Sequence, residues 1–95
     1  MLTHIVLFKL KDRNPENIAK IKGVLAGMQG KIPEFRHFEV GVDIVRSQRS
    51  YDLALVAKFD SLEGFRAYQA HPAHQKVIRS ILSASDSIFA VDYES

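Results

Sequence analysis

Apolar and polar residues recur along the chain at spacings that predict seven elements, beginning with a strand and a helix. A short apolar run at residues 5–8, rich in β-branched and aromatic side chains, predicts a strand that extends to Lys11. Asn14 and Pro15 then offer a capping side chain and a proline suited to the first helical position. The helix that follows stops at Gly30 and has one apolar face, formed by Ile18, Ile21, Leu25 and Met28.

Alternating patterns predict two strands in the middle of the chain. Residues 31–34 turn the chain, and apolar and polar side chains then alternate over residues 38–44. Residues 46–50 form a connecting loop, and residues 51–59 form the next strand. The alternation in this strand predicts one face with Tyr51, Leu53, Leu55, Ala57 and Phe59, and an opposite face with Asp52, Ala54, Val56 and Lys58.

Two helices and a closing strand complete the prediction. Asp60 or Ser61 can cap the first of these helices. Pro72 ends that helix and is well placed to begin another. Residues 83–86 break the second helix, and residues 88–93 form the last strand. The inward positions of the two helices are Leu62, Phe65 and Tyr68, followed by His74, Val77 or Ile78, and Ile81.

The resulting order, βαββααβ, predicts an α+β fold close to the ferredoxin-like arrangement. In such a fold an antiparallel sheet is covered by helices on one face, and its other face is normally polar. Here both sides of the first and last strands are apolar, with Val6, Phe8 and Leu10 against Ile5 and Leu7, and Phe89, Val91 and Tyr93 against Ile88 and Ala90. We therefore expect the free sheet face to pack against a second copy in a two-fold homodimer, giving a dimeric α/β barrel.

Composition narrows the class of protein. The 95 residues are 46% hydrophobic and 25% charged, with no Cys and no Trp, which suits a single small domain over residues 1–95. The lack of cysteine excludes disulfides, thiol nucleophiles and zinc–thiolate sites. No apolar run approaches the ~20 residues of a membrane span, and the start of the chain lacks the basic region of a signal peptide. We therefore expect a cytoplasmic protein with no membrane partner.

The charge balance argues against a nucleic-acid partner. The formal net charge is +2, with nine basic and five acidic residues in positions 1–50 and four basic and six acidic residues in positions 51–95. Nucleic-acid-binding domains usually concentrate a much larger excess of Lys and Arg on one face.

Four histidines and Tyr68 are the residues with useful acid–base chemistry. His37 lies on the polar side of its strand, whereas His4 shares a strand face with apolar residues and is expected to be buried. Tyr68 and His74 both follow inward stripes, so they could line a cleft between helices and sheet together with His4. The alternative is that Tyr68 and His74 only bond backbone groups exposed where Pro72 breaks the helix. The spacing leaves both interpretations open.

Other kinds of site have weaker support. His71 and His74 have a spacing found in metal sites, but Pro72 breaks the helix between them and no Cys or paired carboxylate completes a ligand set. The serines lack the context of an activated nucleophile, and no Gly-rich phosphate loop is present. We therefore expect neither a metal nor a cofactor.

Three segments carry a resemblance to a known family. They are His-Ile-Val-Leu-Phe-Lys at residues 4–9, Tyr68 with His-Pro-Ala-His at residues 71–74, and Val-Asp-Tyr at residues 91–93. Together they resemble the stress-responsive dimeric α/β-barrel (Dabb) family over essentially the whole chain. The resemblance implies a ferredoxin-like protomer and a tight homodimer whose two sheets form a barrel.

The resemblance also implies candidate site residues. Most members of the family have no assigned activity, and some resemble plant stress-induced proteins. One branch is a polyketide cyclase that forms olivetolic acid by an aldol-type ring closure without a cofactor. By that similarity His74 would be the general base, Tyr68 would line and assist the site, Asp92 would orient the His through its main chain, and His4 would lie in the pocket. Leu53 and Leu25 replace a pocket His and a pocket Tyr of the cyclase, so the same substrate is not expected.

Two classes of function follow. In the first, the chain is a dimeric stress-responsive A/B barrel protein that binds a small apolar or carbonyl-containing molecule in a helix–sheet cleft. In the second, it is a cofactor-independent lyase, isomerase, cyclase or monooxygenase in which His74 is the base and Tyr68 the hydrogen-bond donor. The sequence leaves open whether the protein is an enzyme.

Overall fold

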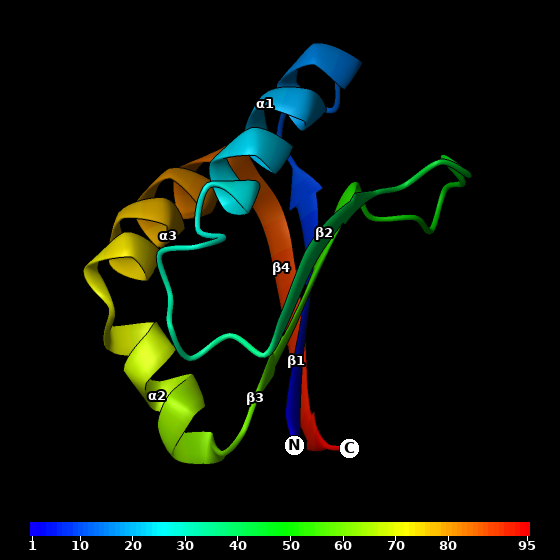
Figure 1. Cartoon of the computed structure of the whole chain (residues 1–95). Coiled ribbons are helices and arrows are strands. Elements are labelled where there is room, and N and C mark those ends of the chain that lie inside the picture. Colours follow the sequence, from blue (N-terminus) through cyan, green and yellow to red (C-terminus); the bar gives the residue numbers. More distant parts are fainter.

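Seven elements follow one another in the computed structural model, which describes all 95 residues (Figure 1). Their order is the predicted βαββααβ, with bounds β1 Leu2–Leu10, α1 Pro15–Ala26, β2 His37–Val42, β3 Leu53–Phe59, α2 Leu62–Ala70, α3 Pro72–Ala84 and β4 Ser85–Glu94. The two termini lie side by side, because the Ser95 amide donates a hydrogen bond of 2.8 Å to the Met1 carbonyl. None of the helices has both the length and the apolar character needed to cross a membrane.

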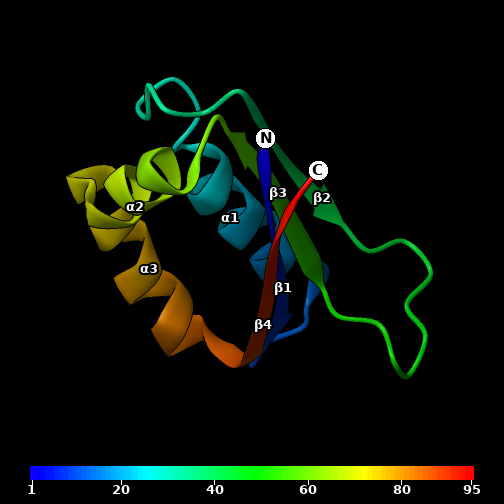
Figure 2. The same ribbon diagram turned by 90° about the horizontal axis from the view of Figure 1, so that it is seen from below.

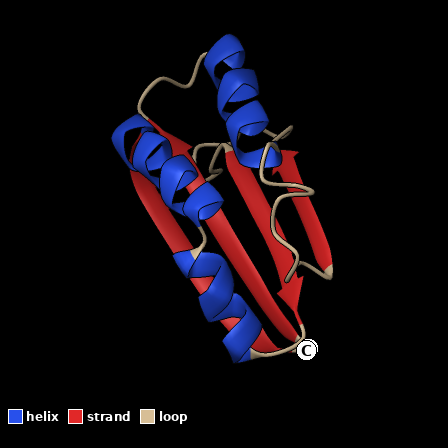
Figure 3. Cartoon of the chain, turned by 60° about the vertical axis from the view of Figure 1, so that its left-hand side comes forward, coloured by secondary structure: helices blue, strands red, loops and turns tan.

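All four strands belong to one antiparallel sheet with the order β2-β3-β1-β4. The helices lie together on one face of this sheet and leave the other face uncovered (Figures 2 and 3). The first and last strands are neighbours, and their register places His4 directly opposite Asp92. This topology confirms the predicted ferredoxin-like α+β fold.

The hydrophobic core fills the space between the sheet and the helices. It combines the inward side of the strands with one stripe of each helix, and Leu10, Phe59 and Ile81 within it are fully buried. Full burial of a side chain of this size is worth about 1.5–3 kcal/mol relative to exposure. The inward stripes read from the sequence therefore account for most of the core.

The ends of the first helix and second strand differ from the prediction. α1 stops at Ala26, and irregular turns follow as far as Gly30. Gly30 has a φ of +84°, a conformation that glycine adopts without a Cβ clash. β2 stops at Val42 rather than at residue 44, because the Asp43 carboxylate accepts a 2.8 Å hydrogen bond from the Arg46 amide and turns the chain out of the sheet.

The second half of the chain is more regular than predicted. Ser61 caps α2, since its hydroxyl accepts a 3.3 Å hydrogen bond from the Gly64 amide. Pro72 begins α3 as predicted, but this helix continues to Ala84 through the expected break. β4 starts at the next residue and is longer than the predicted segment 88–93.

The side-chain directions of Tyr51 and Asp52 are opposite to the prediction. β3 begins only at Leu53, so the strand alternation does not extend to the two residues before it. Asp52 is fully buried instead of facing outward. The Tyr51 hydroxyl bonds Ser87 at 2.9 Å and its ring stacks on Phe89, on the uncovered side of the sheet.

The uncovered face of the sheet is apolar along β1 and β4. Leu7 lies opposite Phe89, and Ile5 lies opposite Val91, so these four side chains share one face. Phe89 is 62% exposed and Val91 54% exposed. Large apolar side chains gathered in this way are unusual on a free surface and typically mark an interaction site.

Candidate functional site

His4 and Asp92 form a pair at the bottom of the helix–sheet interior. The two residues are directly opposite in the β1/β4 register, and His4 Nδ1 is hydrogen-bonded to the Asp92 carboxylate. His4 is buried as predicted, with its ring 4.8 Å from that of Phe65. Because the carboxylate fixes Nδ1, the orientation of the His4 ring is set by the sheet itself.

Tyr68 is a buried residue whose hydroxyl has no partner in the chain. The residue is 2% exposed, and its ring lies among those of Phe35, Phe59 and Phe65. Its hydroxyl has no hydrogen-bond partner in the chain. The only side-chain oxygen or nitrogen that is both sealed from solvent and unpartnered is Ser85 Oγ, so the Tyr68 hydroxyl remains accessible. Burial raises the pKa of Tyr68 to about 12, which keeps the hydroxyl protonated and able to donate at neutral pH.

His74 is held by one backbone hydrogen bond. Its Nδ1 lies 3.1 Å from the Gln69 carbonyl oxygen, and since a carbonyl can only accept, Nδ1 must carry the hydrogen. In the neutral ring, Nε2 then has the free lone pair. Burial lowers the pKa of His74, the bond to Gln69 partly offsets this, and charge on His4 lowers it further. His74 is therefore a neutral base near pH 7.

The break between α2 and α3 explains the position of His74. Pro72 breaks the helix, and the Ala73 amide, which would reach the Gln69 carbonyl in a continuous helix, bonds His71 Nδ1. The Gln69 carbonyl accepts instead from the His74 ring and, at 2.7 Å, from the Gln75 side chain. The interpretation that the His bonds an exposed backbone group is confirmed for His74, but Tyr68 forms no such bond. The same bond also fixes the tautomer that leaves Nε2 free.

Three of the predicted site residues come together. The ring centres of Tyr68 and His74 are 4.4 Å apart, and those of Tyr68 and His4 are 6.1 Å apart. A protonated hydroxyl, a neutral imidazole and a carboxylate-bound imidazole therefore meet between α2, α3 and β1. This combination suits a ligand with a polar oxygen and an apolar body.

Asp92 has a different partner from the one implied by the family resemblance. Its carboxylate bonds His4, while His74 is oriented by the hydrogen bond that its Nδ1 donates to the Gln69 carbonyl. The reason is geometric, because Asp92 and His4 face each other across two paired strands. Gln69 was not identified from the sequence, although its place just before a helix-breaking proline is a signal for an unpaired carbonyl.

The other histidines lie outside this cluster. His71 caps α3, with its Nδ1 accepting a 3.0 Å hydrogen bond from the Ala73 amide. His37 is exposed as predicted and lies 3.1 Å from the Glu39 carboxylate. The spacing of His71 and His74 therefore does not bring two imidazoles to one point, and the structure contains no cluster of three His, Asp or Glu suited to a metal ion.

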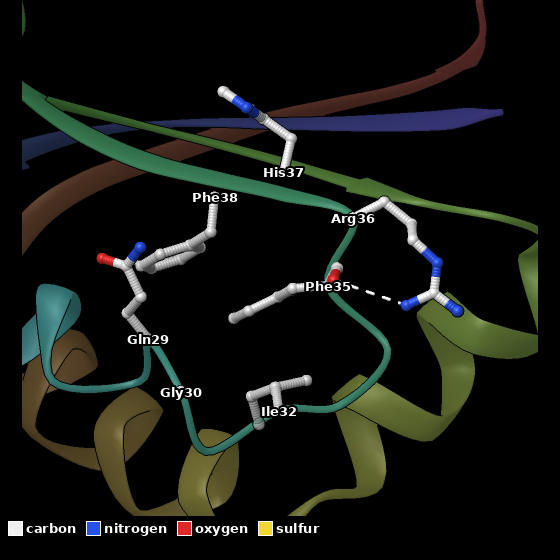
Figure 4. Close-up of a pocket in the computed structure, with 7 residues that line it drawn as sticks. All are labelled: Gln29, Gly30, Ile32, Phe35, Arg36, His37 and Phe38. Carbon is white, nitrogen blue, oxygen red and sulfur yellow. Dashed lines mark hydrogen bonds between the residues drawn. The ribbon is translucent and has the colours of Figure 1, made fainter.

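A cavity lies beside the cluster and is separated from it by one aromatic ring. It has a volume of about 500 Å³ and lies between the irregular segment after α1 and the start of β2 (Figure 4). Phe35 and Phe38 form its apolar wall, with ring centres 4.5 Å apart. The Phe35 ring also lies 5.2 Å from that of Tyr68.

The expected cavity bounded by all three polar residues is absent from the principal cavities of the structure. None of the five is lined by His4, Tyr68 or His74. The aromatic rings of Phe35, Phe59 and Phe65 pack around Tyr68 and fill that space. Sequence reasoning missed Phe35 because the segment between α1 and β2 has no periodic pattern.

A second polar cluster was also missed. The carboxylate of Asp52 is fully buried and accepts hydrogen bonds from the Leu10 amide at 2.8 Å and from Arg13 Nε at 3.0 Å. Arg46 Nη1 lies 2.9 Å from the same carboxylate. Burial acts to raise the pKa of Asp52, but the Leu10 amide and the two guanidinium groups outweigh it and lower the pKa overall.

Comparison with known proteins adds the evolutionary context. The family model described as Stress responsive A/B Barrel Domain matches residues 2–95. The stress-response A/B barrel domain-containing protein HS1 of Arabidopsis thaliana is 29% identical over 94 residues, covering 96% of this chain and 86% of that protein. A crystal structure of a dimeric ferredoxin-like protein of unknown function from Thermobifida fusca has a TM-score of 0.87 at 32% identity, covering 99% and 90% of the two chains.

An enzyme is found among the structural neighbours. Hydroxynitrile lyase from Passiflora edulis has a TM-score of 0.82 at 21% identity, and the similarity covers 97% of this chain and 90% of the lyase. At this level of identity the comparison shows a shared fold and nothing about activity.

Proposed function

Since the chain belongs to the stress-responsive A/B barrel domain family, we propose that it works as a homodimer that binds a small apolar, carbonyl-containing molecule between its helices and sheet. The observation that carries the binding proposal is the contact between Tyr68 and His74. It combines a protonated, unpartnered hydroxyl with an imidazole whose Nε2 is left free. A ligand carbonyl would accept a hydrogen bond from Tyr68 while its apolar part packs against the surrounding rings.

The ligand would enter from the cavity beside Phe35. This cavity of about 500 Å³ is within the usual range for small-molecule sites, and its Phe35 wall is shared with Tyr68. The ring of Phe35 is only half-buried, so its rotation would open a path from the cavity to Tyr68 behind it. Rotation of one side chain would then join the cavity to the Tyr68 hydroxyl.

The homodimer proposal rests on the apolar open face of the sheet. Phe89 and Val91 on β4 and Leu7 on β1 are all exposed there, and the similar Thermobifida fusca protein is described as dimeric. A two-fold axis through this face would pair the same residues from both copies and cover them. The helices, and with them Tyr68 and His74, would remain on the outer side of the assembly.

Sedimentation at micromolar concentration tests the dimer. The wild type should sediment at twice the protomer mass of 10.7 kDa. Phe89→Glu should give a folded monomer, because it places a charge in the buried interface. Leu82→Glu is the matched control, since Leu82 on α3 is 59% exposed, close to the 62% of Phe89. A wild-type monomer, or equal dissociation of both variants, would contradict the proposed interface.

Titration with acetophenone, a small apolar ketone, tests the ligand site by amide NMR. We expect chemical-shift changes centred on residues 35–38 and 68–74. Tyr68→Phe should weaken binding about fivefold to tenfold, the equivalent of one hydrogen bond of about 1–1.4 kcal/mol. Arg79→Gln is the control, because it alters an exposed residue on α3 that does not line the cavity. Shifts confined to the open sheet face, or equal effects of both variants, would contradict the proposal.

A second candidate function is proton abstraction next to a carbonyl, favoured by the fixed tautomer of His74. Nε2 would take the proton from the carbon beside the carbonyl, and the C–H electron pair would form the enolate double bond. The enolate oxygen, which carries the negative charge, would accept the hydrogen bond from Tyr68. Return of the proton to carbon completes the exchange and regenerates the neutral imidazole.

Deuterium exchange distinguishes binding from this chemistry. In D₂O, an active site would replace the methyl hydrogens of acetophenone with deuterium, measured as loss of the proton NMR signal. His74→Asn can still donate to the Gln69 carbonyl but has no base, so it should bind the ketone and lose the exchange. Exchange at the uncatalysed rate in the wild type would leave ligand binding as the function, and unchanged exchange in His74→Asn would exclude His74 as the base.

A further inference from the structure

A second concave site lies on the opposite side of α1 from the Tyr68 cluster. This groove of about 480 Å³ is formed where the first turns of α1 meet the end of β2 and the β2–β3 loop, which extends away from the rest of the molecule (Figure 1). Its apolar surface comes from Pro15, Ile18, Ala19 and Val42. None of these residues lies on the open face of the sheet, because Val42 pairs with the inward-facing Leu53. The sheet-to-sheet contact of the proposed dimer would therefore not cover these four apolar side chains.

The rim of the groove is basic. Arg13, Lys22 and Arg46 line it, and Asp43 is the only acidic residue among the lining residues. With the buried Asp52 included, three cations face two carboxylates, so one positive charge is left over. Lys22 is exposed and forms no ion pair or hydrogen bond in the structure, so it can meet an incoming anion.

The two arginines are fixed in place by a buried carboxylate. Arg13 Nε lies 3.0 Å and Arg46 Nη1 2.9 Å from Asp52 Oδ1, and Arg13 Nη2 donates to the Ser50 carbonyl at 3.2 Å. A guanidinium has five N–H donors, so each arginine keeps donors that these contacts do not use. Anchoring removes much of the side-chain entropy that arginine normally loses on binding an anion.

The backbone at Arg46 supports a role for its side chain. Arg46 is the one non-glycine residue with positive φ, at 55°, a conformation that favours glycine or asparagine. The turn is held by the Asp43 carboxylate, which accepts the Arg46 amide at 2.8 Å. A left-handed conformation in this tight turn thus directs a long cationic side chain back toward Asp52, where a glycine would give the same turn without the guanidinium.

We propose that this groove binds an amphipathic carboxylate with a medium-length aliphatic chain. Its carboxylate would bridge the free donors of Arg13 and Arg46, with Lys22 nearby, because the planar guanidinium matches carboxylate geometry. Its chain would lie over the apolar side chains of α1 and β2. The site shares no residue with the Tyr68 and His74 cluster, so it stands independently of the function proposed above.

Titration with sodium octanoate by amide NMR, at low ionic strength and pH 7, tests this site. We expect shift changes confined to residues 13–22 and 42–46. Octanol, which has the same chain and no charge, should bind at least tenfold more weakly, and acetate should give no saturable shift. Equal binding of octanoate and octanol, or shifts centred on Leu7, Phe89 and Val91, would overturn the proposal.

Two variants and one control distinguish the loss of a positive charge in the groove from a loss of folding. Arg46→Gly removes the guanidinium while suiting the positive φ, and Lys22→Gln changes an exposed residue on α1. Each should weaken octanoate binding at least threefold and leave the spectrum well dispersed. Arg79→Gln on the exposed side of α3 removes the same charge away from the groove and should leave binding unchanged. An equal loss in Arg79→Gln would show a general charge effect and overturn the site.

Discussion

The two buried polar clusters of this chain differ in how completely their hydrogen bonds are satisfied. Asp52 receives a backbone amide and two guanidinium groups, and both carboxylate oxygens are used. Tyr68 has an unpartnered hydroxyl, and the neutral ring of His74 uses only Nδ1 in its bond to Gln69. One cluster has nothing left for a ligand at its centre, whereas the other keeps a donor and a base free.

This difference separates stabilising groups from groups available for chemistry. A buried charge contributes to stability only when its partners replace the water that it loses. Asp52 meets that requirement and ties together β1, the segment before α1 and the β2–β3 loop. The Tyr68 hydroxyl instead has no partner in the chain and is not sealed from solvent, so it stays available to a ligand.

The largest expected effect is on the satisfied cluster. Asp52→Ala should lower the free energy of unfolding by about 3 kcal/mol, because the Leu10 amide and two guanidinium groups lose their acceptor. Urea denaturation followed by circular dichroism measures this loss. Asp52→Asn keeps an acceptor oxygen and should recover part of it. A change below about 1 kcal/mol in Asp52→Ala would remove the proposed contrast between the clusters.

The position of Asp52 shows where sequence patterns stop being informative. The helix and strand periods predicted the element order, and the inward face from Leu53 to Phe59 is buried as expected. The same alternation placed Asp52 outward, since nothing in the sequence marks the strand as starting two residues later, at Leu53. Its partners Arg13 and Arg46 come from separate loops, and a contact between three irregular segments has no periodic signature.

The next effect tests Phe35, whose ring separates the cluster of His4, Tyr68 and His74 from the cavity beside it. Phe35→Ala should cost about 2 kcal/mol, less than the roughly 3–5 kcal/mol for truncation of a fully buried aromatic residue, because the ring is only half-buried. The same change should join the cavity of about 500 Å³ to Tyr68 and strengthen acetophenone binding in the NMR titration. Phe35→Trp should weaken binding. Weaker binding in Phe35→Ala would show that the ring is a ligand contact rather than a barrier.

The three residues of this cluster, His4, Tyr68 and His74, were easier to predict from the sequence than the residues around them. Tyr68 and His74 fall on inward helical stripes beside a proline, so spacing alone brought them together, and His4 follows from strand alternation. Phe35 and Gln69 act through an irregular segment and a backbone carbonyl. An irregular segment has no periodic pattern, and a backbone carbonyl is present at every residue, so the sequence does not mark either contribution.

A smaller effect is expected where a polar group has no partner to lose. Tyr68→Phe should change the free energy of unfolding by less than about 0.5 kcal/mol, because the hydroxyl forms no hydrogen bond within the chain. Paired urea curves of Tyr68→Phe and Asp52→Ala give the comparison directly. A loss above about 1.5 kcal/mol in Tyr68→Phe would mean that the hydroxyl is bonded in solution and that the two clusters are alike.

The smallest effect concerns the protonation of His74. Burial lowers the pKa of this imidazole, so its proton NMR titration should have a midpoint below the ordinary value of about 6.5. Below about pH 6.5 the unfolded chain binds this proton more readily than the folded chain, so His74 destabilises the fold progressively as the pH falls toward its lowered pKa. His74→Asn should remove that part of the pH dependence and leave stability at pH 8 nearly unchanged, because the asparagine amide can still donate to Gln69. A midpoint above the ordinary value of about 6.5 would contradict the lowered pKa and the role of His74 as a neutral base beside Tyr68.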